Sequence, residues 1–236
     1  MILEAARAAL SRLFTPEFRA VLWKSLGLTA LVLVLAWFGI AGLFDWVALP
    51  WIDDWMPRMP DWAGWLGTAG TIVAGVVLAL VLGLLIAPVT ALIAGFFQDD
   101  VAAIVEAEDY PDDAPGRPVP TLRSAVLSAK FLGVVILGNL LALFLLLVPM
   151  VNLAAFFVVN GYLLGREFFE FAAMRHRPEV EAKAMRKRNG GTVFAAGLLI
   201  AAFLAVPVLN LLTPLFAAAM MVHLHKMLAR REAARP

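Results

Sequence analysis

Four long stretches of the chain contain no aspartate, glutamate, lysine or arginine. They cover residues 25–44, 62–98, 131–165 and 189–225, and they are 20, 37, 35 and 37 residues long. A helix needs about 20 consecutive apolar residues to cross the hydrocarbon core of a membrane. Charged residues make up only 16% of the chain, whereas soluble domains contain about 25%. The sequence therefore predicts an all-α integral membrane protein whose chain enters the membrane several times.

The charges between these stretches predict the orientation of the chain. Every lysine and arginine except Arg58 lies in a segment that can be on the same side of the membrane as the N-terminus. The positive-inside rule makes that side cytoplasmic. Four aspartates accompany Arg58 in the segment 45–62, and five tryptophans lie around it, as in the aromatic belts of membrane interfaces. We expect this loop to face the periplasm of a bacterial inner membrane, and both termini to be cytoplasmic.

The same pattern divides a single expected membrane domain into segments. The expected order is an N-terminal interfacial helix (1–19), a first span (20–44), a periplasmic loop (45–62), a second span (63–98), an acidic cytoplasmic loop (99–123), a first hairpin (124–165), cytoplasmic helices (166–189), a second hairpin (190–228) and a tail (229–236). Within the first segment, most apolar residues of 1–14 lie on one helical face, which predicts an amphipathic helix in the membrane interface.

The two hairpins are predicted from a repeated pattern. The letters V-P-x-x-N-L occur at 148–153 and again at 206–211, each time inside a charge-free stretch that has a cation at both ends. A helix of 35 residues would extend about 52 Å, far beyond a core of about 30 Å, so each stretch has to fold back. The expected tips are Pro149 with Asn152 and Pro207 with Asn210. Each arm keeps only about 15–17 residues, which predicts partially inserted hairpins, although two short hairpins that cross fully are the alternative.

Each tip is also expected to start a helix. Asn152 would cap the helix that returns from the first tip, and either Asn210 or the pair Thr213-Pro214 would start the helix that returns from the second. The free N–H groups at such a helix N-terminus favour an anion, which makes both tips a possible anion path. The alternative is that proline and asparagine only make the turns.

The sequence has no signature of a common enzyme class. It contains no G-x-x-x-x-G-K-[ST] pattern for ATP, no G-x-S-x-G nucleophile and no cysteine. His223 and His225 fall on different sides of a helix, so we expect interfacial histidines rather than a metal site. The aspartates of 109–113 lack calcium-loop spacing and are expected to be solvated. We therefore expect no enzyme activity, no metal, no cofactor and no nucleic-acid partner. Without acids or lysines inside the four stretches, a solute would move through a channel or a passive carrier, or its movement would draw on charges at the cytoplasmic rim.

The segment 160–170 reads N-G-Y-L-L-G-R-E-F-F-E. Together with the two V-P-x-x-N-L tips, the Arg188-Asn189 pair and the histidine-bearing C-terminal helix, it resembles the CysZ sulfate permease family of the etoposide-induced membrane protein superfamily. The resemblance implies two long transmembrane helices and two partially inserted hairpins, assembled as a homo-oligomer in the lipid bilayer. It also implies passive uptake of sulfate or a related oxyanion for cysteine synthesis, without ATP.

The resemblance also names candidate anion-binding residues. The family's proposed sulfate site is a Gly-Leu-Arg motif, often followed by a second arginine, just before the first long span. The matching residues 15–20 read T-P-E-F-R-A, so that Glu17 replaces the glycine, Phe18 replaces the leucine and Ala20 replaces the second arginine. Arg19, with Lys24 and Thr15, is the candidate site, and the alternative role of Arg19 is that of a positive-inside anchor.

A third set of candidates is Tyr162, Arg166 and Glu167. These residues could line a cytoplasmic vestibule that gathers anions. Alternatively, Arg166 and Glu170 form an i, i+4 pair that only orients the helix. The leading hypothesis is a passive sulfate permease of the inner membrane, and the alternative is a scaffold or regulatory protein of the same superfamily that does not transport.

Overall fold

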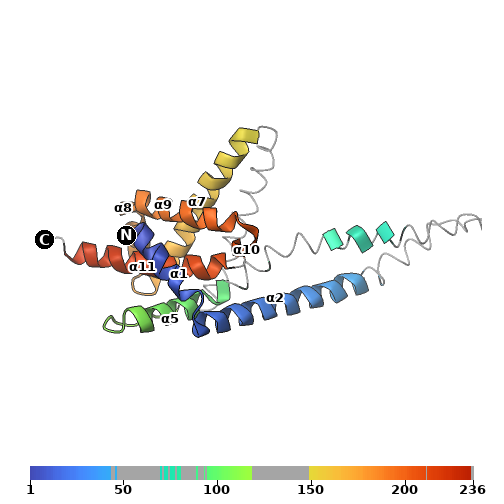
Figure 1. Cartoon of the computed structure of the whole chain (residues 1–236), viewed down its shortest axis with the longest axis horizontal. Helices are drawn as coiled ribbons and strands as arrows, with labels where there is room; N and C mark the ends of the chain where they lie inside the picture. Colours follow the sequence, from blue (N-terminus) through green and yellow to red (C-terminus); the bar gives the residue numbers. More distant parts are fainter. Residues whose placement is uncertain are drawn as a thin grey trace, which may run out of the picture. The chain divides into compact units, whose positions relative to one another are not determined.

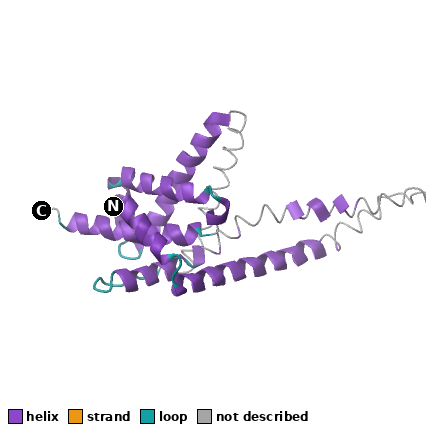
Figure 2. Cartoon of the chain, in the orientation of Figure 1, coloured by secondary structure: helices purple, strands orange, loops and turns teal. Residues whose placement is uncertain are grey.

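The computed structural model of the chain describes residues 1–43, 46, 98–118, 149–210 and 212–234, with isolated residues between 70 and 97. For residues 149–153, 207 and 208 it describes the backbone alone. All regular elements in these ranges are helices, as Figure 2 shows. The prediction of an all-α protein is confirmed for this part of the chain. Most of the expected periplasmic loop, most of the second span and the first arm of the first hairpin lie outside the described residues.

The helices are α1 (Ile2–Arg12), α2 (Pro16–Leu43), α5 (Gln98–Asp109), α7 (Pro149–Met174), α8 (Glu179–Arg188), α9 (Gly190–Leu204), α10 (Pro207–Asn210) and α11 (Thr213–Ala233). Figure 1 labels them along the chain. The chain divides into two compact units, of which the first contains residues 1–24 and 94–236 and the second contains residues 25–93. The assignment of segments to membrane or cytoplasm stays a prediction.

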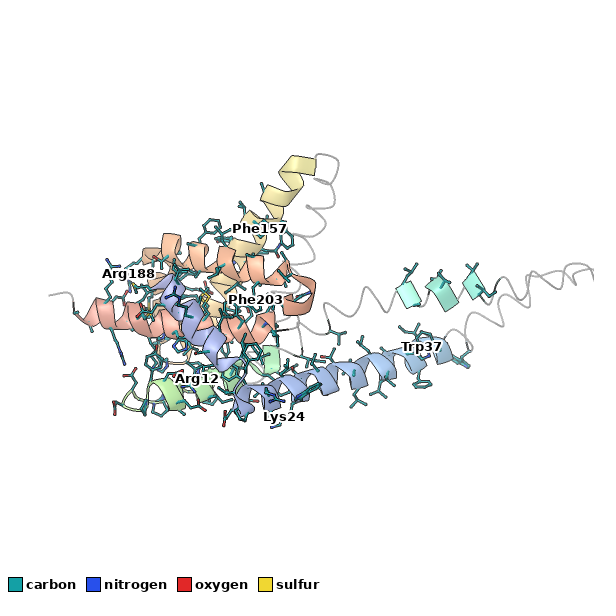
Figure 3. All side chains as sticks on the ribbon, in the orientation of Figure 1. Arg12, Lys24, Trp37, Phe157, Arg188 and Phe203 are labelled. Atoms are coloured by element: carbon teal, nitrogen blue, oxygen red, sulfur yellow. The ribbon has the colours of Figure 1, made fainter. Side chains whose placement is uncertain are left out.

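Helix α2 has the length and composition of a membrane span. It has 28 residues, and among the described helices it alone is long and apolar enough to cross a membrane. At 1.5 Å per residue it extends about 42 Å. Large apolar side chains are exposed along it, namely those of Leu31, Val34, Leu35, Trp37 and Phe38, and Figure 3 labels Trp37. Soluble proteins rarely expose apolar surface of this extent, so this part of α2 is suited to lipid.

The N-terminal segment is two helices rather than the single helix expected over 1–19. Helix α1 ends at Arg12, and α2 begins at Pro16, before the start expected at residue 20. Proline is favoured at the first position of a helix because its φ is already helical and its missing N–H would have no acceptor there. The turn between the helices is closed by the Thr15 amide, which donates to the Arg12 carbonyl at 3.0 Å.

Helix α1 uses part of its apolar surface for protein contacts. Ala5 and Ala9 are fully buried, and α1 contacts α11 and α9. Three residues that were expected on the membrane face remain exposed, namely Leu3, Leu10 and Phe14. The small side chains allow α1 to lie close to α11, and the exposed apolar residues stay available to a membrane interface.

Helix α11 is the central helix of the first unit. It contacts α1, α5, α7 and α9, and its side chains are buried along most of its length. Figure 1 shows α11 beside α1 and α9. Phe203 of α9, labelled in Figure 3, stacks on Phe216 of α11 with ring centroids 4.4 Å apart. The helix begins at Thr213 with Pro214 in its first turn, so this start, and not Asn210, is the correct one.

The tips are helical where the structure describes them. Helix α7 includes Asn152 within its first turn, so the expectation that Asn152 caps this helix is wrong. Pro207 and Asn210 are the first and last residues of α10, and helices α9 and α11, which α10 joins, are in contact. Proline begins both tip helices, where it costs no hydrogen bond. The depth of either tip in a membrane stays a prediction.

Residues 98–109 form helix α5 and not the acidic loop expected over 99–123. The expectation gave weight to acids and prolines, but the prolines begin at Pro111, after the helix has ended. Three apolar residues on one helical face are buried, namely Val101, Ala102 and Val105. Asp99 and Asp100 lie in the first turn, where the helix dipole favours negative charge. The segment is therefore an amphipathic helix that packs on α11.

Two further helices extend beyond the expected boundaries. Helix α7 continues past residue 165 to Met174, because Phe168 and Phe169 continue its buried face. Helix α11 continues through the expected tail to Ala233. Between them, α8 lies where a helix is predicted from its acidic first turn and basic last turn.

Candidate anion-binding site

Thr15, Arg19 and Lys24 lie at the start of α2, but they do not converge. The Thr15 hydroxyl donates to the Arg12 carbonyl at 3.0 Å, so its proton is used within the turn. Arg19 and Lys24 are both exposed, and their spacing places them about 140° apart around the helix axis. Neither has a carboxylate partner among the described residues. An anion could reach Arg19 without meeting Lys24, and an anion-binding role for the three residues stays a prediction.

Two of the three departures from the Gly-Leu-Arg pattern, Glu17 and Phe18, have structural consequences. Glu17 lies in the first turn of α2, where the helix dipole favours an acid. Phe18 is fully buried in the hydrophobic core of the first unit. The start of α2 is therefore anchored by packing, and the next residue, Arg19, is exposed.

The tip residues do not form a side-chain site in the described part of the chain. The backbone of Pro149, Asn152 and Pro207 is described without their side chains, and Asn210 is exposed. At the start of α11, the Thr213 hydroxyl donates to the carbonyl of Leu209 at 3.2 Å. The threonine thus closes the turn between α10 and α11, and an anion path at the tips stays a prediction.

The third set of candidates leads to a cluster between α7 and α8. Nε of Arg166 lies 3.6 Å from Oε1 of Glu170, and Nε of Arg186 lies 2.6 Å from the same oxygen. The i, i+4 pair proposed from the sequence is therefore present, and Arg186, which the sequence did not indicate, extends it from α8. Tyr162 lies one turn before Arg166 and is 49% exposed.

Glu167 is the titratable neighbour of this cluster on α7. Burial raises the pKa of Glu167 to about 7, and the Glu170 carboxylate raises it further while Arg166 opposes the rise. Near neutral pH the carboxyl is therefore about half protonated. The charge around Arg166 then depends on the pH of the surrounding solution.

A buried polar network around Glu106 was not predicted from the sequence. Arg175 donates to both carboxylate oxygens of Glu106, from Nε at 3.0 Å and from Nη2 at 2.9 Å. Nε2 of His176 lies 2.9 Å from Oε1, and the Gly116 amide donates to Oε2 at 3.0 Å. Arg175 also pairs with Asp99 at the start of α5. The network therefore joins α5, the loop after it and the end of α7.

The environment of Glu106 keeps it ionised. Burial acts to raise its pKa, but the hydrogen bonds from His176 and Arg175 outweigh burial and lower the pKa to about 2. A Cβ atom added at Gly116 would lie 2.7 Å from Oε1 of Glu106, so only glycine lets the loop come this close. The sequence signal for this network is an acid on the apolar face of α5, one turn after the buried Ala102.

A second polar cluster holds the loop after α5 against α11. Lys226 and Arg230 pair with Asp113, at 3.1 and 3.5 Å. The Tyr110 hydroxyl lies 2.9 Å from Nδ1 of His223. Asp109 pairs with Arg12 of α1, which Figure 3 labels. The expectation that the aspartates of this segment are solvated is therefore wrong for Asp109 and Asp113.

The histidines of α11 are buried and not interfacial. Both His223 and His225 are 2% exposed. The ring of His225 stacks on that of His176 with centroids 5.3 Å apart and lies against Phe169. Within the described residues no group of three or more potential metal ligands comes together. These histidines pack the interior of the first unit, and sequence spacing alone could not show which helices surround them.

Glycines bring α7 and α9 into close contact. A Cβ added at Gly165 would lie 2.6 Å from the carbonyl oxygen of Val193. A Cβ added at Gly197 would collide with the carbonyl oxygen of Gly161 and lie 2.8 Å from Cα of Gly165. Small residues at such a crossing let two helix backbones approach closely. The two glycines of the N-G-Y-L-L-G-R-E segment therefore have a packing role that fixes α7 against α9.

The family described as sulfate transporter CysZ/etoposide-induced protein 2.4 matches residues 5–214 of the chain. The chain belongs to this family. No relative among the curated proteins matches it. The match confirms the resemblance seen in the sequence and covers every candidate residue described above. Membership in the CysZ/etoposide-induced protein 2.4 family, together with the apolar helix α2, identifies a membrane protein of the transporter type.

Proposed function

We propose that the chain is a passive, ATP-independent permease for sulfate or a related oxyanion. It would act as a homo-oligomer in a bacterial inner membrane and supply sulfate for cysteine synthesis. The family match over residues 5–214 carries the proposal. The sequence has no phosphate-cradling motif for ATP, and its four charge-free stretches contain no acid or lysine for ion coupling, which supports passive movement.

Helix lengths support hairpins that enter the membrane without crossing it. Helix α9 has 15 residues and extends about 22 Å, less than a hydrocarbon core of about 30 Å. Helix α11 is longer, but it reaches the buried His223 and Lys226 well before its end. A pair of helices with these lengths can place its tip within the membrane while its open end stays in the cytoplasm.

Ion pairs between the basic segments support a shared cytoplasmic side. Arg12 of α1 pairs with Asp109 of α5. Arg177, just before α8, and Arg188, the last residue of α8, both pair with Glu232 of α11 at 3.0 Å. Segments that pair directly in water lie on one side of a membrane. The positive-inside rule assigns these same segments to the cytoplasm.

A scaffold or regulatory protein that does not transport is the second candidate. It is favoured by the altered motif at the start of α2, where Glu17 and Ala20 stand in place of glycine and the second arginine. It is also favoured by the position of Lys24, which lies on a different side of α2 from Arg19, so that the two could not bind the same anion.

Growth of a bacterium that lacks its own sulfate uptake systems separates the two candidates. The permease is expected to restore growth when a low concentration of sulfate is the only sulfur source. Growth on cysteine, with or without the chain, is the control for toxicity. Failure to restore growth, with the full-length chain detected in the inner membrane, would favour the scaffold.

A further inference from the structure

Arg166 and Arg186 differ from the other paired arginines in the donors they use. Both approach Oε1 of Glu170 through Nε. Their Nη groups have no acceptor in the part of the chain that the structure describes. Each guanidinium is thus held at its base while its two outer nitrogens stay free.

The other paired arginines of the first unit use those outer nitrogens. Arg175 pairs through Nη1 with Asp99 and through Nη2 with Glu106. Arg188, labelled in Figure 3, donates from Nη2 to Glu232 at 3.0 Å. Arg175 therefore uses both of its outer nitrogens, and Arg188 uses Nη2 together with Nε. The pair at Glu170 differs because two guanidinium groups contact one oxygen while both keep their outer nitrogens.

The free donors match the chemistry of a tetrahedral oxyanion. A guanidinium presents its N–H groups as a planar fork that binds sulfate- or phosphate-like oxygens in pairs. The Arg186 side chain is 16% exposed and that of Arg166 is 44% exposed, so solvent reaches both. The exposed Tyr162, one turn before Arg166, adds a hydroxyl on the same side of α7. Both arginines already contact Glu170, and Arg186 is largely buried, so part of their side-chain freedom is lost before an anion binds.

The charge balance favours weak binding, as a transport site requires. Two guanidinium groups face one carboxylate at Glu170, and the neighbouring Glu167 adds a second acid on α7. The four groups carry a net charge of +1 when Glu167 is protonated and none when it is ionised, so the acids limit the attraction for an anion. A site on a transport path has to bind strongly enough to receive an ion and weakly enough to release it.

We propose that Arg166 and Arg186, held in place by Glu170, form a binding site for a tetrahedral oxyanion at the cytoplasmic end of α7. The inference rests on the proposed function, because the site would receive the anion where it leaves the membrane. The Glu170 carboxylate competes with the anion for the two arginines and promotes its release.

Sulfate titration of the purified full chain tests the site. The protein is placed in nanodiscs of phosphatidylcholine, and binding is followed by calorimetry at constant ionic strength. Arg186→Gln is expected to weaken sulfate binding at least about tenfold, since a charged hydrogen-bond pair is lost. Arg186→Lys should weaken it as well, because lysine keeps the charge without the fork. Glu170→Gln should strengthen binding, and Arg188→Gln, the matched control on the same helix, should leave it unchanged.

Unchanged binding in folded Arg186→Gln and Arg186→Lys overturns the site. If the wild-type chain in proteoliposomes still takes up sulfate in that case, the proposed function stands and the anion binds elsewhere. If sulfate binding weakens in the two variants as expected but the wild-type chain shows no uptake, the site is supported and the proposed function is contradicted.

A lipid phosphate has the same tetrahedral chemistry, and a second arm separates the two sources. The titration is repeated in nanodiscs that contain phosphatidylglycerol, and retained lipid is measured by native mass spectrometry. The site predicts that sulfate binding still depends on Arg186. The opposite result would be that phosphatidylglycerol stays bound to the wild-type chain but not to Arg186→Gln, and that sulfate binds in neither kind of nanodisc. The two arginines would then bind a lipid headgroup, and the proposal for a free anion would be overturned.

Discussion

Glu106 shows how a single buried acid can hold several segments together. Burial without partners would raise the pKa of a carboxyl and favour its neutral form. Here Arg175, His176 and the Gly116 amide all contact it, and the pKa is lowered to about 2. Removing one partner from such a network leaves the others buried without their hydrogen bonds, which is costly.

Glu106→Gln is therefore expected to destabilise the first unit in a pH-dependent way. Because the folded pKa of about 2 lies below the unfolded value of 4.5, the carboxylate contributes stability above pH 4.5 and loses it as pH falls towards 2. At pH 7 the variant should lose roughly 3 kcal/mol of unfolding free energy. Denaturant unfolding in detergent at pH 7 and pH 3.5 measures it, with the more exposed Glu232→Gln as the control. An equal loss at both pH values would contradict this explanation.

Gly116→Ala tests the close approach of the loop to Glu106. The new Cβ would lie 2.7 Å from one carboxylate oxygen and 2.9 Å from Nε of Arg175. We expect a loss of roughly 1–3 kcal/mol, as for other overpacked sites, measured as a lower thermal unfolding midpoint. Gly190→Ala, where nothing lies within 4 Å of the added carbon, should change the midpoint little. A midpoint for Gly116→Ala equal to wild type would show that the loop does not approach Glu106 so closely.

At the scale of helices, patterns local in sequence predicted some of the elements that the structure describes. The acidic start and basic end of α8 indicated that helix, and Thr213-Pro214 was one of two predicted starts of α11. Helix α5 was missed because its acids outweighed three buried apolar residues in the prediction. The Glu106–Arg175 and Glu170–Arg186 pairs were missed because they join different elements. No spacing in a single sequence shows which distant charges meet.

The crossing of α7 and α9 gives a prediction at this scale. Gly197→Ala would push a methyl group into the Gly161 carbonyl and force the helices apart. We expect a loss of roughly 1–3 kcal/mol and a lower thermal midpoint in detergent. Gly191→Ala on the same helix meets nothing within 4 Å and serves as the matched control. Equal midpoints for the two variants would mean that the two helices do not cross at these glycines.

For the whole molecule, the charge pattern predicts one orientation in the membrane, with the basic segments in the cytoplasm. Because the chain contains no cysteine, a single introduced cysteine is the only thiol that a maleimide can label, and its labelling shows on which side of the membrane it lies. In intact cells Asp54→Cys should react with a membrane-impermeant maleimide, and Lys187→Cys should react only after the membrane is permeabilised. Labelling of both positions in intact cells would contradict a single orientation with a cytoplasmic basic side.

Uptake of radiolabelled sulfate by proteoliposomes tests the proposed permease most directly. The purified chain should give saturable uptake without ATP, driven by the sulfate gradient alone, and Arg19→Ala should reduce it if the anion meets α2 on its way. Uptake that is equal in Arg19→Ala would keep the permease and move its site, most directly to Arg166 and Arg186. Folded protein that gives no more uptake than empty liposomes would contradict the permease.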